Sequence, residues 1–340
     1  MDITEAIIRL SETSGASGAE VGAAETALEM LREYCPDAYI SKGNVIGIFP
    51  AAGENMPFVL LDAHIDQVGM IVTSVTDDGF VKFAGLGGLD ERLLPAQPVV
   101  IHGKTDIRGV ICSVPPHLSG DGDTVPDIAS SAIDTGMTKD ELEAAVAPGD
   151  AVTYDVRCRR LHGSRLTGRA LDDRCGVAAI LYAVSLLREN APECGYGVVF
   201  SVQEELGERG ARLAAYSLKP DIAIAVDVSF GLAPGEKAEK CGILGKGPMI
   251  GISPCLSREV SQGLFSAAKS LGIPYQTEVM EGLTSTNADQ YSVGGTGAKA
   301  CTLSIPLRNM HTPVEVIDTA DVELTGRLLA EYIRMVKEGD

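Results

Sequence analysis

The sequence contains no tryptophan, and aromatic residues make up only 5% of its 340 residues. So few aromatics argue against a glycosidase, and no two well-separated carboxylates stand out as the flanks of a sugar groove. Lysine and arginine are also scarce, 28 against 47 acids, which gives a formal net charge of -19 at pH 7. Because phosphate binding requires clustered cations and no run of them exceeds two residues, we expect no nucleic acid partner.

Disulfide motifs and membrane segments are missing as well. The eight cysteines are scattered without a CxxC pair in a chain large enough to fold without cross-links, so we expect reduced thiols. The beginning, MDITEAIIRLSETSG, carries acids in place of a basic n-region. No apolar stretch is long enough for a signal peptide or a membrane span. We therefore expect a soluble, cytoplasmic protein that does not contact membranes.

Two patterns of hydrophobicity divide the chain. Helical spacing covers residues 3–10 and 21–34, and the strand-like runs NVIGIF and PFVLLDAH follow. After Leu171, helical segments again alternate with short apolar runs, as far as a closing helix in DTADVELTGRLLAEYIRMVKE. Continuous apolar strands that alternate with helices predict an α/β sheet covered on both faces. With 45% hydrophobic residues, the chain can bury a large core and hold two domains.

The middle of the chain has a different texture. Between about Val68 and Leu161, short β-type runs are broken by Gly, Pro and Asp. Residues 118–136 are predicted to form a long surface loop, and a brief helix is expected near TKDELEAAV. We predict that residues 67–162 form a small all-β domain inserted into an α/β domain made of residues 1–66 and 163–340.

Polar residues stand where the predicted α/β strands end, the usual place for a site in an open α/β sheet. His64 and Asp66 in LLDAHIDQVG are two apart and so share a face, although a lone histidine of this kind is more often structural. Asp172 and Asp173 stand where a helix begins, which suits an N-cap equally well. Alone, these positions leave the structural and functional interpretations open.

Three more stretches add to this set. The pair Glu204 and Glu205 follows the apolar run GYGVVFSVQ, and His311 follows a strand in IPLRNMHTPVEVID. Asp227 lies within IAIAVDVSF, where an unpaired carboxylate would carry a heavy desolvation penalty, so it requires a nearby cation. Two histidines and several acids without a thiolate among them suit Zn, Co or Mn in a catalytic site, whereas structural zinc prefers Cys-rich cages. The sequence thus favours a catalytic metal site.

These motifs also carry a family resemblance. In chain order, DAHIDQVGMIV, RALDDRCG, QEELGERGA, VDVSF and IPLRNMHTPVEVI resemble the tetrahedral-type dinuclear aminopeptidases of metallopeptidase family 42, also called glutamyl aminopeptidases. The resemblance covers nearly the whole chain, and the β-rich insert falls where the family carries a small β-barrel dimerisation domain. It implies an α/β/α sandwich with a mixed central sheet, plus the inserted barrel.

The resemblance implies two divalent metal ions per chain, with zinc preferred over cobalt or manganese. Asp172 would bridge the two ions. His64 and Asp227 would complete the ligands of one ion, and Glu205 and His311 those of the other. A shared water or hydroxide would then occupy the open position.

The resemblance further implies roles for the two remaining acids. Glu204, turned away from the metals, would be the general base that takes a proton from the bridging water, and Asp66 would orient the His64 imidazole. The implied reaction is hydrolysis of the N-terminal residue of short peptides. The implied partners are these peptides and further copies of the chain, as a dimer building block or a tetrahedral dodecamer.

Three residues depart from the family pattern. Gln67 stands where an acid usually follows His-x-Asp, and Asn287 stands at the Asp of a Gly-Gly-Thr-Asp-Ala turn. Asn309 replaces a common aromatic. The Asn287 turn bears on substrate preference more than on metal binding, and we expect residues 283–289 and 231–247 to contribute to the pocket for the N-terminal side chain.

Two alternatives remain at this stage. One is another dinuclear hydrolase on the same scaffold, such as an N-acyl amidohydrolase, a dipeptidase or a carboxypeptidase, which would use the same kinds of metal ligands. A non-enzymatic assembly protein would share the fold, although an intact Glu204 and Glu205 pair argues against it. Comparing free-amine with N-blocked substrates separates the aminopeptidase from an N-acyl hydrolase.

Overall fold

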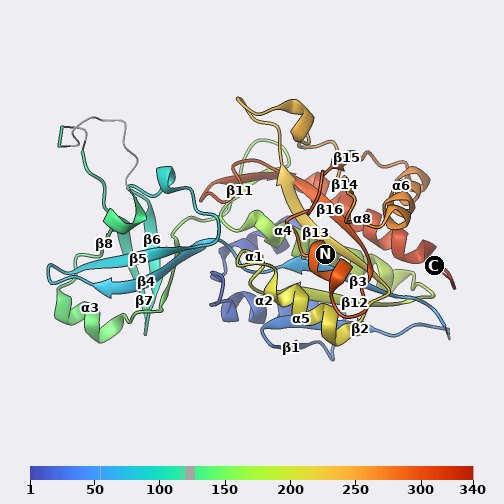
Figure 1. Ribbon diagram of the computed structural model, residues 1–340, viewed down its shortest axis with the longest axis horizontal. Helices are drawn as coiled ribbons and strands as arrows, with labels where there is room; N and C mark the ends of the chain where they lie inside the picture. The colour runs from blue at the N-terminus through green and yellow to red at the C-terminus, as the bar shows by residue number, and fades with distance from the viewer. Residues whose placement is uncertain (54, 116, 119–126, 340) are drawn as a thin grey trace.

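The structure, a computed structural model, describes residues 1–53, 55–115, 117–118 and 127–339. It consists of a larger α/β body, which carries both chain ends, and a smaller β-barrel beside it (Figure 1). Among the described residues, the body is built on an eight-stranded mixed sheet and the barrel closes with six strands. The predicted fold class, an α/β sandwich with an inserted barrel, is confirmed.

The eight-stranded sheet has its most buried strands at the centre. Its order is β1 (Tyr39–Ser41), β2 (Asn44–Phe49), β12 (Gly195–Ser201), β3 (Phe58–His64), β13 (Ile222–Phe230), β16 (Lys299–Leu307), β14 (Met249–Ile252) and β15 (Gln276–Val279). The four central strands, from β12 to β16, are parallel to one another. Because helices cover both faces, these strands are buried and mostly apolar, which explains their long apolar runs.

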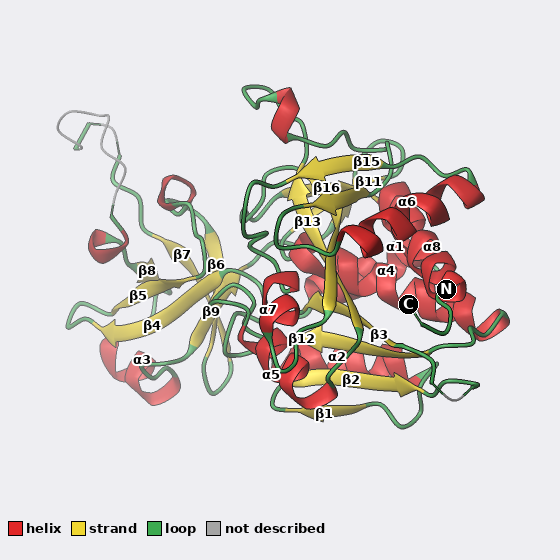
Figure 2. Cartoon of the chain, turned by 45° about the vertical axis from the view of Figure 1, so that its right-hand side comes forward, coloured by secondary structure: helices red, strands yellow, loops and turns green. Residues whose placement is uncertain are grey.

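Helices lie on both sides of this sheet (Figure 2). They are α1 (Ile3–Glu12), α2 (Val21–Arg32), α4 (Leu171–Glu189), α5 (Arg209–Leu218), α6 (Arg258–Leu271), α7 (Ala288–Val293) and α8 (Thr319–Met335). The long α4 packs against α8 and against β3 and β13, while α5 and α7 pack against each other. The helices predicted from periodicity are confirmed, whereas the six-residue α7 is too short to show a period and was not predicted.

The barrel follows the order β4 (Gly69–Val75), β5 (Phe80–Leu86), β8 (Ile133–Asp134), β7 (Asp106–Ile111), β6 (Pro98–His102) and β9 (Ala151–Tyr154). It has an apolar core of its own. The brief helix expected near TKDELEAAV is α3 (Lys139–Ala145), and Thr138 begins it with a capping box. All six strands lie within the predicted insert 67–162, whose exact boundaries stay a prediction.

The loop predicted over residues 118–136 is only partly correct. Residues 119–126 lie outside the described residues. Residues 128–130 form a short 3-10 helix, and β8 pairs with both β5 and β7 and so closes the barrel. A two-residue strand is too short to show alternation, and the sequence therefore gave no sign of it.

Smaller elements complete the structure. A three-stranded sheet contains β10 (Arg159–Arg160), β11 (Arg165–Gly168) and β17 (Glu315–Asp318). Two further 3-10 helices cover Glu91–Leu93 and Ala238–Lys240. All eight cysteines are free thiols. Within the described part of the chain, no helix has the length and apolar character needed to cross a membrane.

Candidate active site

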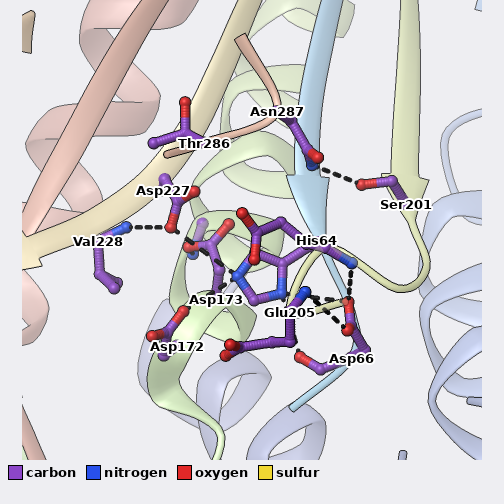
Figure 3. Close-up of polar contacts among 12 residues, drawn as sticks. His64, Asp66, Asp172, Asp173, Ser201, Glu205, Asp227, Val228, Thr286 and Asn287 are labelled. Carbon is purple, nitrogen blue, oxygen red and sulfur yellow. Dashed lines mark hydrogen bonds and ion pairs between the residues drawn. The ribbon is translucent and has the colours of Figure 1, made fainter. Parts of the chain in front are cut away.

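The five predicted metal ligands line one cavity at one edge of the large sheet. Figure 3 shows four of them, His64, Asp172, Glu205 and Asp227, lying close together. Since β3, β12, β13 and β16 are parallel, their carboxyl ends share this edge. His64 ends β3, Glu205 lies in the turn after β12, Asp227 is near the end of β13, and His311 follows β16. Asp172 comes from the start of α4, which packs against β3 and β13.

Asp172 occupies the middle of this group. Its Oδ1 lies 3.0 Å from His64 Nε2, and its Oδ2 lies 3.4 Å from His311 Nε2. His64 Nε2 is also 3.8 Å from Asp227 Oδ1, and His311 Nε2 is 3.2 Å from Glu205 Oε1. Asp172 thus lies between two pairs of possible metal ligands. One of its oxygens faces His64 and Asp227, and the other faces His311 and Glu205.

The acids around Asp172 are crowded and removed from water. Burial and the neighbouring carboxylates raise the pKa of Asp227 to about 8 and that of Glu204 to about 9, despite the opposing effect of His64. Such shifts express the free-energy cost of holding several anions together in a poorly solvated place. Bound cations would remove much of that cost and would lower both pKa values.

His64 is held in a defined orientation. Its Nδ1 lies 3.1 Å from the backbone oxygen of Asp66, so Nδ1 is the protonated nitrogen and Nε2 faces Asp172 and Asp227. The Asp66 carboxylate lies 3.4 Å from the same Nδ1. It also accepts hydrogen bonds from the backbone N–H groups of Glu204 and Glu205, at 3.0 and 3.2 Å. Asp66 thereby fixes one histidine and the turn with both glutamates.

His311 is oriented by the barrel side of the molecule. Its Nδ1 donates to the backbone oxygen of Gly88, 3.0 Å away, which leaves Nε2 to face Asp172 and Glu205. A Cβ at Gly88 would lie only 2.8 Å from His311 Nδ1. Gly88 lies in the connection between the barrel strands β5 and β6, so a barrel loop reaches the candidate site. The loop has room for the imidazole because Gly88 carries no side chain.

Asp173 and Glu315 belong to the site but were not assigned a role from the sequence. The Asp172–Asp173 peptide bond is cis, and Asp173 Oδ2 is buried without a hydrogen-bond partner. One carboxylate oxygen of Asp173 lies within 4.8 Å of ligand atoms of His64 and Asp227, so the three side chains could hold one metal ion. Its adjacency to Asp172 was visible in the sequence, but the N-cap interpretation accounted for it equally well.

Glu315 connects the backbone at Asp172 with the backbone at His311. Its Oε2 accepts from the backbone N–H groups of Leu171 and Asp172, at 2.7 and 3.2 Å, and its Oε1 accepts from the N–H of His311 at 3.1 Å. Burial and the nearby Asp172 raise the pKa of Glu315 well above its usual range. An acid within the apolar VEVID was the signal that could have revealed it, as the same reasoning revealed Asp227.

The three departures from the family pattern lie behind or beside the ligands. Asn287 Nδ2 donates to Asp62 Oδ1 at 2.5 Å and to Ser201 Oγ at 2.8 Å in a buried network below the site. Gln67 is buried and accepts from Arg169 at 2.7 Å. Asn309 is exposed with a φ of 57°, a conformation that asparagine adopts more readily than an aromatic residue.

The ligands open into a cavity of about 480 Å³. From the predicted pocket segment 283–289 it includes Thr284, Ser285 and Thr286, whereas none of residues 231–247, all of which the structure describes, lines it. The structure therefore does not place the second segment at this cavity, and its contribution to the side-chain pocket stays a prediction. After β13 the chain leaves the cavity at Phe230, where Gly231 pairs with Gly242 in an isolated bridge.

The chemistry of this site fits divalent cations. Carboxylate oxygens of Asp172, Glu205 and Asp227 lie within 3.8 Å of the Nε2 atoms of His64 and His311, and imidazole is itself a common metal ligand. Asp172, Glu205 and His311 place one ligand atom each within 4.8 Å of one another. The buried and unpartnered Asp173 Oδ2 adds a further acceptor that a cation could satisfy. Imidazole with carboxylates and no thiolate is a typical donor set for a catalytic zinc-type site.

Comparison with known proteins agrees with this geometry. A model of the M42 glutamyl aminopeptidase family matches residues 43–328. The lysyl aminopeptidase of Pyrococcus furiosus is 32% identical, over 99% of this chain and 98% of its own length.

Solved structures give the same result. The aminopeptidase APDkam598 from Desulfurococcus kamchatkensis superposes with a TM-score of 0.91 at 31% identity, covering 98% of this chain and 97% of that one. The TET1 peptidase of Pyrococcus horikoshii, described as assembling into a tetrahedron or a large octahedral shell, gives 0.85 at 30% identity, covering 98% and 100%. By sequence along most of its length and by fold, the chain is a member of the M42 glutamyl aminopeptidase family.

Proposed function

We propose that the chain is a dinuclear-metal aminopeptidase that removes the N-terminal residue of short peptides. Membership of the M42 family supports the reaction class. The observation that carries the proposal is the position of Asp172, whose two carboxylate oxygens face His64 on one side and His311 on the other. A carboxylate in that position suits a bridge between two cations.

The proposed metal ligands are the five residues predicted from the sequence: His64, Asp172, Glu205, Asp227 and His311. Zinc suits this donor set best, with cobalt or manganese as alternatives. When bound, two such ions supply an acidified water at neutral pH and polarise the carbonyl group of the scissile bond.

Glu204 is the proposed general base. It lines the cavity, and one of its carboxylate oxygens lies within 4.8 Å of a ligand atom of His64 and of a ligand atom of Glu205. From there it would take a proton from the attacking water and deliver it to the leaving amine. Asp66 is proposed as a positioning residue, since it holds the backbone N–H of Glu204 as well as the His64 ring.

The test is hydrolysis of a panel of aminoacyl-p-nitroanilides by metal-loaded protein, beside Glu204→Gln and an N-acetylated substrate. Loss of a general base lowers kcat by about 10²- to 10⁴-fold. We expect that loss in Glu204→Gln, with unchanged metal content. Failure to hydrolyse any free-amine substrate would contradict the proposal, and turnover of the acetylated substrate alone would indicate an N-acyl hydrolase.

We also propose that the chain forms homo-oligomers, with the barrel as the dimerisation surface. The assembled TET1 relative supports this. A dimer, or a tetrahedral dodecamer built from dimers, is expected on gel filtration with light scattering. A monomer at micromolar concentration would contradict it. The cytoplasmic location and the absence of nucleic acid and membrane partners stay predictions.

A further inference from the structure

The cavity beyond the metal ligands contains a second acidic feature. Glu278 on β15 lines it, and its two carboxylate oxygens accept hydrogen bonds from different hydroxyl groups. Ser229 Oγ donates to Oε1, and Ser304 Oγ donates to Oε2 at 2.6 Å. The carboxylate is therefore held in place from two neighbouring strands, β13 and β16, while it remains open to the cavity.

Glu278 lies beside the proposed ligand Asp227. Ser304 is the direct partner of Asp227 across β13 and β16, and Ser229 is two residues beyond Asp227 on the same face of β13. Neighbouring strands are about 4.8 Å apart, and two residues along a strand span about 6.6 Å. The Glu278 carboxylate is thus held by two residues that neighbour Asp227, roughly the length of one side chain from that proposed ligand.

Glu278 lines the cavity and keeps part of its hydrogen-bonding capacity. Each carboxylate oxygen accepts up to two hydrogen bonds, and each uses one of them for a serine. One acceptor position per oxygen is left for a donor that enters with the substrate. Among the described residues, no lysine or arginine lines the cavity to neutralise this anion from the protein side.

The cavity that Glu278 lines also has apolar lining residues. Met280, Phe230 and Met310 all line the cavity, and Phe230 is 56% exposed. A lysine or arginine side chain combines an aliphatic stem with a cationic head, and it packs its stem on apolar surface while the head meets a polar partner. An acidic side chain would instead meet Glu278 as a like charge.

We propose that Glu278 is a specificity-determining residue that binds the cationic side chain of an N-terminal lysine or arginine. This inference rests on the proposed aminopeptidase function. The stem would lie along Met280 and Phe230, and the head would donate charge-assisted hydrogen bonds to the two oxygens that the serines leave accessible.

The test compares lysyl- and norleucyl-p-nitroanilide, which differ in that lysine carries a terminal ammonium. A hydrogen bond to a charged group is worth a factor of about ten to a hundred in kcat/KM. We expect the metal-loaded wild type to prefer the lysyl substrate by that factor. Glu278→Gln should reduce the lysyl value to the norleucyl level and leave norleucyl turnover unchanged, which also shows that the variant is folded. Glu281→Gln, an exposed acid three residues away, is the matched control and should retain the preference.

Two outcomes would overturn the inference while the proposed function stands. In one, the wild type hydrolyses both substrates equally well. In the other, Glu278→Gln lowers both values by the same factor, which would assign Glu278 to the shared α-ammonium group or to the fold. Absence of turnover of either substrate by the wild type would instead overturn the aminopeptidase proposal itself.

Discussion

The edge of the large sheet buries ionisable side chains, whereas the interior of the barrel does not. At the edge of the large sheet, His64, Asp66, Asp172, Asp173 and Asp227 are all buried. Between residues 69 and 154, the described residues that are both buried and polar are Ser131 and Thr153, neither of them charged. The barrel follows the ordinary rule that ionisable groups stay at the surface.

This difference shows what each region is built to do. An apolar interior such as the barrel core stabilises its fold by burial alone. A group of buried acids opposes folding unless something offsets the desolvation and the repulsion. The sheet edge therefore lowers the stability of the fold, and bound cations would offset that cost. The following predictions, from the largest effect to the smallest, test that contrast.

Asp172→Asn should have the largest effect. The substitution removes the one charge that faces both histidines, so we expect loss of bound metal and activity below detection, with the barrel still folded. Elemental analysis, peptide hydrolysis and circular dichroism measure these three properties. Full activity with full metal content in this variant would show that Asp172 is not the bridge.

Gly88→Ala tests whether the barrel-side segment takes part in the site. The added methyl group would meet the His311 ring at 2.8 Å and disturb the hydrogen bond from Nδ1. Loss of a partner that orients a ligand typically costs about 10- to 100-fold in metal affinity or activity. Metal titration and kcat/KM are the measurements. Gly85→Ala, three residues earlier in the chain, is the matched control, because Gly85 has no positive φ and its Cβ would make only ordinary contacts with Ile128 and Leu89, at 3.4 and 3.6 Å. Equal effects of the two substitutions would contradict the account.

Metal removal should destabilise the sheet body more than the barrel. An ion at a hundred times its dissociation constant stabilises the protein that binds it by about 2.7 kcal/mol. Calorimetry should therefore show that a chelator lowers the Tm of the wild-type body by several degrees. In Asp172→Asn, which should bind no metal, the chelator should change the Tm little. An equal shift in that variant would mean that the metal acts elsewhere.

Asp77→Asn should have the smallest effect. Asp77 is 93% exposed on the barrel and pairs with Lys139 at 2.6 Å. Water and salt screen such a pair, so its loss should leave Tm, metal content and activity unchanged. Thermal melting beside the wild type measures this. A large loss of stability would show that charge matters in the barrel as it does at the sheet edge.

Much of this architecture could be predicted because it depends on local patterns. The long α4 and α8 show helical periodicity, the strands are short apolar runs, and four of the five proposed ligands lie at or just after the ends of parallel strands. Asp227 was identifiable because a carboxylate within IAIAVDVSF needs compensation. Topology then brings these strand ends to a common edge.

The parts that could not be predicted depend on contacts between distant segments. The two-residue β8 acquires its strand conformation from β5 and β7. Glu315 binds backbone groups 143 and 144 residues earlier in the chain. Gly88 matters through its closeness to His311, which is 223 residues away. No pattern in a short window records such pairings, and the same is true of Glu278 and its two serines.

The most direct test of the central claim is the metal stoichiometry of the sheet edge. Metal-free protein would be loaded in turn with zinc, cobalt and manganese, desalted, and measured by elemental analysis beside Asp172→Asn. The account predicts two ions per chain in the wild type for the preferred metal, and loss of both in the variant. A wild type that binds no ion, or a variant that binds as many as the wild type, would contradict the claim that these buried acids form a dinuclear metal site.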